Sequence, residues 1–284
     1  MSADTCPTAE REPGILYRGV SDAEYHGDET SLSSSGARTI VFRGAAQYRY
    51  ERLNGATRKK EFDDGHAAHL YVLGEGSPVE IVDYRSWQSD AAKAAKEQAY
   101  AAGRVPLLRK DDETARGMAK VCLEHELAGA LFGEGEAELS GWWVDGETGA
   151  LLRLRLDWLT TINGRLVVVD YKTSKNAGRA AFGKAVGEFG YYLQQPFYVD
   201  GLEALDIDDD PDFVFVSQCK TPPYEVTVAR LDAEDVQRGR ELNRRAIRTY
   251  AECMASGRWP DGSNHIHRVS VPTYIRYRDL EILS

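Results

Sequence analysis

Asp170 and Lys172 lie two positions apart at the end of an apolar run that covers residues 166–169. In a strand, residues i and i+2 point to the same face, so this carboxylate and this ammonium are expected to share one site. A carboxylate can hold a divalent cation, and an ammonium can stabilise charge or orient the attacking water at a phosphodiester. The pair therefore predicts metal-dependent cleavage of phosphodiester bonds.

A second carboxylate is expected nearby, because a single one rarely holds Mg²⁺. Asp157 supplies it near the end of the preceding predicted strand, and Asn163-Gly164 is a typical hairpin turn between the two strands. This turn would place Asp157 beside Asp170, provided that the register does not slip by one residue. The sequence thus predicts a site for Mg²⁺, with Mn²⁺ as a substitute.

The elements that must position these residues are three strands in a meander. They are expected at residues 136–144, 150–159 and 166–171, with turn signals between them. Glu138, on the first of these strands, is either a further carboxylate of the site or a residue that faces solvent. Shorter strands are expected at residues 79–82, 105–108, 213–217 and 225–231.

Segments with helical periodicity precede and follow this meander. Ser33-Ser34-Ser35 offers an N-cap, and the following helical face is expected to bury Ala37, Ile40, Val41, Ala45 and Tyr48. Further helices are expected at residues 62–73, from 111–113 onwards, and at 180–186, 191–205 and 233–255. This order predicts an α/β fold in which a central mixed sheet is flanked by helices, with an N-terminal helical part.

The length of 284 residues fits one large domain or two small ones, and the chain contains no repeat and no low-complexity linker. Residues 1–14 are polar and contain two prolines, which predicts a flexible tail. Residues 15–284 are expected to form a single domain.

The expected compartment is a reducing cytoplasm. No run of about 18 apolar residues predicts a membrane span, and the N-terminus does not resemble a signal peptide. The cysteines are far apart and form no CxxC, which argues against structural zinc and iron–sulfur sites. Free thiols are therefore expected at all four: Cys6, Cys122, Cys219 and Cys253.

The net charge of −10 counts against a general nucleic-acid coat protein, but a nuclease can contact DNA locally. Basic residues concentrate in one segment, where Glu51 and Glu61 are the only acids among them: Arg38, Arg43, Arg49, Arg52, Arg58, Lys59 and Lys60. They are either phosphate contacts or a solvated helix face. Arg43, Arg49 and Arg52 are the candidate DNA-binding residues, and arginines at 238–248 are the next candidates.

The order of Asp157 and then Asp170-x-Lys172 resembles the signature of PD-(D/E)XK nucleases. Gly65-x-x-x-His69 is similar to the upstream motif of the RecB-like branch, in which the histidine binds metal. The resemblance implies that His69, Asp157 and Asp170 hold the metal and that Lys172 assists the water and the developing charge. Alternatively, His69 is a histidine of the core, and Asp170 and Lys172 lie at a solvated strand end.

Gln194-x-x-x-Tyr198 is similar to the downstream helix motif of the same branch. With its flanks at residues 32–35, 62–73 and 189–201, the chain resembles the RecE-like exonucleases, also called exonuclease VIII, over residues 20–260. The resemblance implies a catalytic or DNA-contacting role for Gln194, whose alternative is to brace neighbouring backbone. Tyr198 is expected to pack.

This resemblance implies a Mg²⁺-dependent 5′-to-3′ exonuclease that acts on double-stranded DNA ends and leaves 3′ single-stranded tails. A single-strand annealing protein would take the tails, in the cytoplasm of a bacterial host as in phage recombination. A homo-oligomer is also an expected state.

Two features set the chain apart from other relatives. It lacks the cysteine set of iron–sulfur nucleases and a GxxxxGK[ST] motif, which predicts a stand-alone enzyme. Two alternatives stay open: a structure-specific or restriction-type endonuclease on the same fold, and a non-catalytic DNA-binding recombination scaffold.

Overall fold

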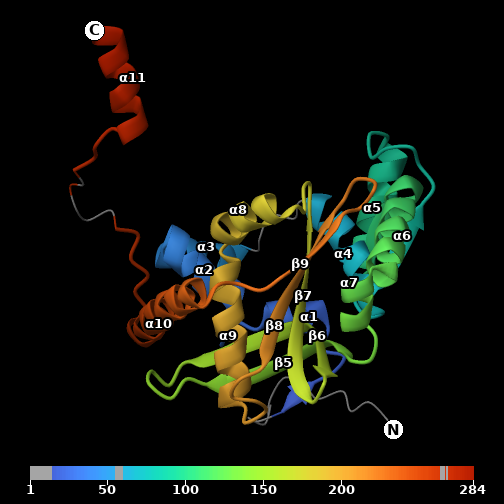
Figure 1. Cartoon of the computed structure of the whole chain (residues 1–284), viewed down its shortest axis with the longest axis horizontal. Coiled ribbons are helices and arrows are strands. Elements are labelled where there is room, and N and C mark those ends of the chain that lie inside the picture. Colours follow the sequence, from blue (N-terminus) through green and yellow to red (C-terminus); the bar gives the residue numbers. More distant parts are fainter. Residues whose placement is uncertain (1–14, 55–59, 263–265, 267) are drawn as a thin grey trace.

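The computed structural model describes residues 15–54, 60–262, 266 and 268–284, so the expected tail at 1–14 and the basic residues Arg58 and Lys59 lie outside it. Within these residues, a seven-stranded mixed sheet crosses the molecule in the order β1-β5-β6-β7-β8-β9, with β2 paired to β6 (Figure 1). Its strands have these bounds: β1 Leu16–Tyr17, β2 Leu32–Ser33, β5 Glu136–Val144, β6 Leu151–Ile162, β7 Arg165–Ser174, β8 Asp212–Cys219 and β9 Val226–Ala229.

The expected meander is present, because β5, β6 and β7 pair antiparallel in sequence order. Asn163 and Gly164 form the turn between β6 and β7 with φ values of +51° and +78°, the left-handed geometry of a two-residue hairpin. Strand β8 then pairs parallel to β7, and α8 (Arg179–Phe189) and α9 (Tyr191–Ala204) make the crossover between them. The α/β fold with a central mixed sheet is confirmed.

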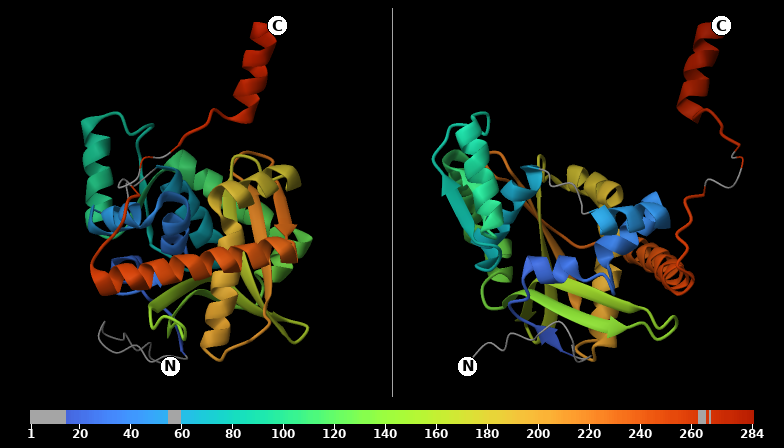
Figure 2. Two further views of the ribbon diagram at one scale, coloured as in Figure 1. Left: turned by 90° about the vertical axis from the view of Figure 1, so that its left-hand side faces the viewer. Right: turned by 180° about the vertical axis from the view of Figure 1, so that it is seen from behind.

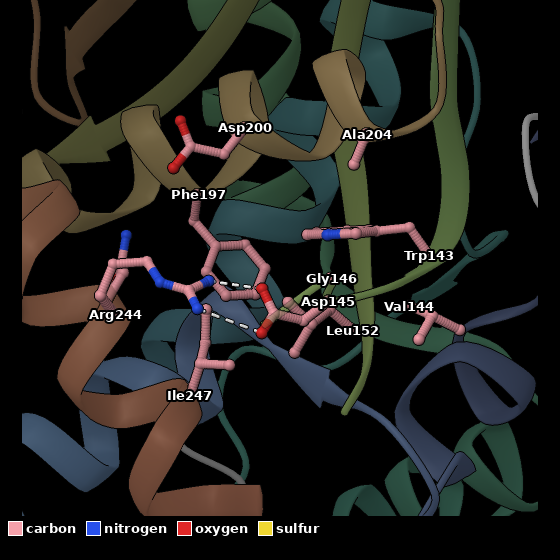
Figure 3. A pocket seen from close by; sticks show the side chains of 11 residues that line it. Trp143, Val144, Asp145, Gly146, Leu152, Phe197, Asp200, Ala204, Arg244 and Ile247 are labelled. Carbon is pink, nitrogen blue, oxygen red and sulfur yellow. Dashed lines mark hydrogen bonds and ion pairs between the residues drawn. The ribbon is translucent and has the colours of Figure 1, made fainter. Parts of the chain in front are cut away.

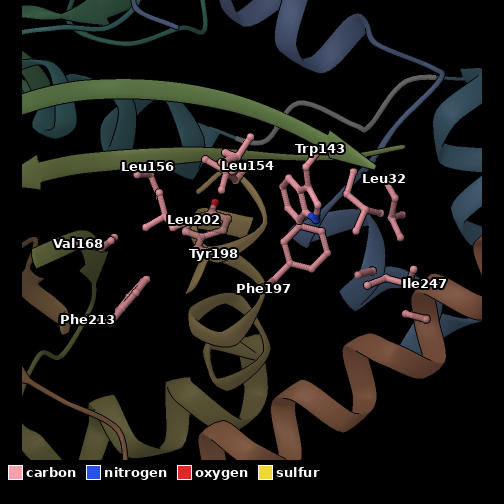
Figure 4. Close-up of a cluster of buried hydrophobic side chains, with 14 of the residues drawn as sticks. Leu32, Trp143, Leu154, Leu156, Val168, Phe197, Tyr198, Leu202, Phe213 and Ile247 are labelled. Carbon is pink, nitrogen blue, oxygen red and sulfur yellow. The ribbon is translucent and has the colours of Figure 1, made fainter. Parts of the chain in front are cut away.

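Helices cover both faces of this sheet. On one face, α2 (Ser34–Arg43), α9 and α10 (Ala233–Ser256) enclose a core with side chains from β6, β7 and α9 (Figure 4). On the other face, α4 (Lys60–Leu73), α6 (Arg109–Glu124) and α7 (Glu126–Leu131) enclose a second core. Strand β7 alternates between them: Val168 lies in the first core, and Val167 and Val169 lie in the second.

The helix expected after Ser33 is two helices. Ser33 caps α2 as expected, since its Oγ accepts a hydrogen bond from Gly36 N at 3.2 Å. Gly44, with φ of +90°, then ends α2, and α3 (Ala45–Asn54) begins at the next residue. The expected face is buried at Ala37, Ile40, Ala45 and Tyr48, and Val41 packs against it. The face is divided between two helices, because glycine readily adopts a backbone angle that a helix cannot contain.

A small outer layer and a separate helix complete the fold. Strands β3 (Val79–Val82) and β4 (Val105–Leu108) pair parallel in a sheet of their own, and α5 (Asp90–Ala101) packs on it. Helix α11 (Thr273–Leu283) lies apart from the body and buries no residue (Figure 2). Among the described helices, none combines the length and the hydropathy that crossing a membrane requires.

Candidate active site

Three carboxylates lie level with one another on adjacent strands: Glu138 on β5, Asp157 on β6 and Asp170 on β7. The pairs beside them define this register, because the residue after Asp157 pairs with the residue before Glu138 and with the residue before Asp170. The slip of one residue that would have separated Asp157 from Asp170 does not occur. The hairpin turn thus brings the two predicted carboxylates side by side, and β5 adds a third.

Strands β5 and β6 both interrupt their alternation at the carboxylate. Ala137 and Leu139 would share a face in a regular strand, yet they lie in opposite cores, and so do the neighbours of Asp157. Glu138 has a φ of +51°, which few residues other than glycine adopt. Such a conformation costs about 1–3 kcal/mol and occurs preferentially at functional sites. Because both strands are interrupted at one level, the pairing on either side stays in register.

His69 reaches the row from α4. Its Nδ1 lies 3.8 Å from Asp157 Oδ2, and one ligand atom each from His69, Glu138 and Asp157 lie within 4.8 Å of one another. At Gly65, one turn earlier, α4 passes beside β7, where a Cβ would make an ordinary contact with Thr173 Oγ1 at 3.5 Å. An imidazole and two carboxylates are donors that divalent cations accept.

Asp170 and Lys172 share one face of β7, as their spacing predicted. Lys172 Nζ lies 2.5 Å from Asp170 Oδ2, and Gln194 Nε2 donates to Asp170 Oδ1 at 2.7 Å. Tyr198, one turn after Gln194, hydrogen-bonds to it and packs in the core. The downstream motif therefore holds Asp170 in place from α9, and Lys172 lies over the ring of Tyr191 at 5.1 Å.

The ligand cluster differs from the expected set of His69, Asp157 and Asp170. Glu138 stands in the cluster, and Asp170 lies beside it in the ion pair with Lys172. Asp170 Oδ2 is nevertheless buried next to the cluster, with the ammonium of Lys172 as its partner. The donors present thus fit a divalent cation: two carboxylates and a neutral imidazole, with the carboxylate of Asp170 adjacent.

The electrostatics of the site favour a cation. Burial, together with the nearby carboxylate of Asp157, raises the pKa of Glu138 to about 8, although Arg155 opposes this. Burial also raises the pKa of Asp157, and it raises that of Asp170 to about 6 although Lys172 opposes this. Burial lowers the pKa of His69 to about 4, which leaves a neutral imidazole able to bind metal. Burial acts to lower the pKa of Lys172, but Asp170 and Asp157 together raise it, so its ammonium stays charged.

A second layer orients the carboxylates. Tyr171 N donates to Asp157 Oδ2 at 2.9 Å. Arg155 Nε lies 3.7 Å from Glu138 Oε2, and the same guanidinium donates to Asp22 Oδ1 at 2.8 Å. Asp22 is the first residue of α1 (Asp22–Gly27), a helix that was not predicted from the sequence. An aspartate at a helix start with no metal motif around it gives no signal of this role.

The candidate DNA-binding arginines have partners within the chain. Arg43 pairs with Glu51, and the guanidinium of Arg49 lies 5.5 Å from the ring centre of Trp259. Arg52 donates to two backbone oxygens of the segment around α1, at 2.8 and 2.6 Å. These contacts give Arg52 a structural role that the charge pattern did not indicate.

A pocket of about 100 Å³ lies elsewhere, between β5, α9 and α10 (Figure 3). Arg244 crosses it to pair with Asp145, and Trp143, Phe197 and Asn243 are among its lining residues. None of the candidate catalytic or metal-binding residues lines it. The candidate chemistry is therefore located at the carboxylate row and not in this pocket.

Comparisons with known proteins agree with this geometry. A family model described as a PDDEXK-like domain of unknown function (DUF3799) matches residues 42–271. A crystal structure from Eubacterium rectale, named "Putative exonuclease", superposes with a TM-score of 0.56 and 13% sequence identity, covering 94% of this chain and 97% of that one. At this identity the likeness shows a shared fold. Among curated proteins, none matches the chain.

Proposed function

The chain belongs to the PDDEXK-like family DUF3799, and we propose that it is a metal-dependent nuclease that hydrolyses phosphodiester bonds in DNA. One observation carries the proposal: Glu138, Asp157 and Asp170 lie level on three adjacent strands, with His69 above them and Lys172 beside them. A strand surface with no chemistry would not place one buried and two partly buried carboxylates next to one another, because each loses hydration and repels the others.

The proposed roles follow from the contacts. His69, Glu138 and Asp157 would hold a divalent cation, Mg²⁺ or Mn²⁺, with the buried Oδ2 of Asp170 adjacent. Bound there, the ion would acidify a water and neutralise charge on the phosphate. Arg155, 3.7 Å from Glu138, favours the ionised form that a cation requires.

Lys172 would act on the phosphate side of the site. Its ammonium is held by Asp170 at 2.5 Å and stays charged, so it can donate to a phosphate oxygen or orient the attacking water. Gln194 fixes Asp170 from the opposite side at 2.7 Å and thereby limits where the ammonium can lie. Gln194 is therefore a positioning residue.

The polarity and the substrate form are finer proposals. The resemblance to RecE-like exonucleases supports 5′-to-3′ digestion of linear duplexes that leaves 3′ tails for a single-strand annealing protein in a bacterial cytoplasm. The name of the Eubacterium rectale structure points to the same class of enzyme. A homo-oligomer is compatible with this activity.

The test compares an end-labelled linear duplex with a covalently closed circle of the same sequence, each with Mg²⁺ and with a chelator. The proposal expects loss of the linear duplex in Mg²⁺ only, with the 5′ label released first, and an intact circle. A cut circle would show an endonuclease. Intact DNA of both kinds in Mg²⁺ and Mn²⁺, with DNA still bound, would show a non-catalytic scaffold.

A further inference from the structure

Two phenylalanines stand out by their exposure. Of the seven phenylalanines whose side chains the structure describes, five are buried, and Phe42 and Phe189 are 47% and 50% exposed. They belong to α2 and α8, elements that are about 150 residues apart in the sequence. Exposed rings of this size are common at surfaces that bind another molecule.

Both phenylalanines flank Gly190, the residue that ends α8 and precedes α9. A Cβ at Gly190 would lie 2.7 Å from Phe42 Cε2 and 2.8 Å from Arg38 Cδ, so α2 packs directly on this backbone. Gly190 also has a φ of +67°, which favours glycine. The close approach gathers Phe42, Phe189 and Arg38 into one surface, here called the aromatic rim.

The aromatic rim adjoins the proposed active site through Tyr191. The rings of Phe189 and Tyr191 have centroids 5.8 Å apart, and Lys172 Nζ lies 5.1 Å from the centroid of Tyr191. Arg38 is near enough to lower the pKa of Tyr191, against the larger effect of burial, which raises it. In the part of the chain that the structure describes, Arg38 makes no hydrogen bond or ion pair, in contrast to Arg43 and Arg52.

We propose that the aromatic rim binds an unpaired stretch of the DNA strand that enters the active site, with bases stacked on Phe42 and Phe189 and a phosphate on Arg38. This inference rests on the proposed nuclease function and names how the substrate strand is held. Every base has a π face, so such stacking tolerates any sequence, as a non-specific nuclease requires. Stacking is also insensitive to a net charge of −10, which repels DNA at long range.

The test measures binding of a fluorescent single-stranded oligonucleotide, with Ca²⁺ in place of Mg²⁺ to suppress cutting. Phe42→Leu with Phe189→Leu keeps the apolar packing and removes the rings, and Phe→Trp at both positions keeps the rings. Base stacking on an aromatic ring accounts for roughly 5- to 100-fold in affinity, so the leucine variant is expected to bind at least tenfold more weakly and the tryptophan variant like wild type. Tyr274→Ala, an exposed aromatic on α11, is the matched control.

A second oligonucleotide with abasic sites separates stacking from other contacts. Wild type and the leucine variant should bind it equally, because the bases that the rings contact are absent. Arg38→Ala should instead weaken binding of both oligonucleotides and flatten the salt dependence by about 0.7 in slope. These three results together support the inference.

Unchanged binding of the intact oligonucleotide by the folded leucine variant would overturn the inference, and the rim would then be a protein contact. An equal loss on the abasic oligonucleotide would overturn it as well. The proposed nuclease function fails separately: wild type would then leave linear DNA intact in Mg²⁺, whatever the rim variants do. Thermal unfolding of each variant checks that it is folded.

Discussion

Replacement of Glu138 by glutamine should stabilise the metal-free protein. The folded protein raises the pKa of Glu138 from 4.5 to about 8, so at neutral pH the buried carboxyl is kept protonated while the unfolded chain ionises it. Below pH 4.5 both states hold the proton and the substitution should change little. As pH rises towards 8, the wild type loses stability relative to Glu138→Gln, because release of the proton lowers the free energy of its unfolded state only.

The size of this effect follows from the shift. At pH 7 the ionisation of Glu138 in the unfolded chain lowers the free energy of unfolding by about 3 kcal/mol, since each pH unit above the unfolded pKa contributes about 1.36 kcal/mol. The side chain of Glu138 is 23% exposed, and water lowers this penalty. We therefore expect Glu138→Gln to be more stable than wild type by about 1–2 kcal/mol at pH 7.

Urea unfolding in chelator at pH 4.5 and pH 7 measures the difference, with Glu97→Gln, an exposed glutamate on α5, as the control. Addition of Mn²⁺ at pH 7 should then make the wild type more stable than Glu138→Gln. An ion that binds the folded state stabilises it, and the glutamine variant has lost a ligand. A variant that is less stable than wild type in chelator at pH 7 would refute the reasoning. So would a stability difference that does not change with pH.

Four further substitutions test the rest of the site and the role of Arg52. Asp170→Asn and Lys172→Ala should each lower Mg²⁺-dependent digestion of linear DNA by about 10²-fold or more with normal thermal unfolding, and near-normal activity would remove them from the site. His69→Ala should raise the metal concentration needed for half-maximal activity and be partly rescued by excess metal, whereas an unchanged titration would make it a core histidine. Arg52→Ala should lower the free energy of unfolding by about 1 kcal/mol, because one exposed and one partly buried backbone carbonyl lose a charged donor, and leave the salt dependence of DNA binding unchanged. A flatter salt dependence without loss of stability would return Arg52 to the DNA-contacting set.

The local part of the site could be predicted because it depends on short-range rules. The spacing of Asp170 and Lys172 needs only the period of a strand. The place of Asp157 needs only the turn at Asn163-Gly164, whose left-handed angles define the register of β6 on β7. These rules act over a few residues and are visible in the sequence.

Glu138 could not be assigned in the same way. Its place in the ligand cluster depends on a strand interruption that is matched by one on the neighbouring strand, at Asp157. Glutamate has no preference for a φ of +51°, so no residue type marks the position. Regular alternation would also have placed Ala137 and Leu139 on one face, whereas the structure places them in opposite cores. The signal that could have identified it is the register itself, since Glu138 stands opposite Asp157 once the hairpin of β5 and β6 is known.

The basic segment shows a different limit. A run of arginines in the sequence shows where positive charge is concentrated. The contacts of each arginine depend on residues that are far away in the sequence. Arg52 reaches carbonyls 24 and 26 residues earlier, and Arg49 lies against a tryptophan about 200 residues later. A DNA-contacting role for Arg43, Arg49 and Arg52 stays a prediction, whereas Arg38 combines an unpaired guanidinium in the described structure with a position near the site.

The charge of the row explains why a strained strand is retained there. Three ionised carboxylates with Lys172 would leave two negative charges, and Arg155 is largely committed to Asp22 at 2.8 Å. Without an ion, the pKa values of Glu138 and Asp170 are raised in the folded protein, so bound protons reduce the negative charge of the row. A divalent cation held by His69, Glu138 and Asp157 would balance this negative charge, and its binding would release those protons. The left-handed angle at Glu138 is then the local strain that turns its carboxylate towards this charge, since a regular strand would direct Ala137 and Leu139 to one face and Glu138 to the other.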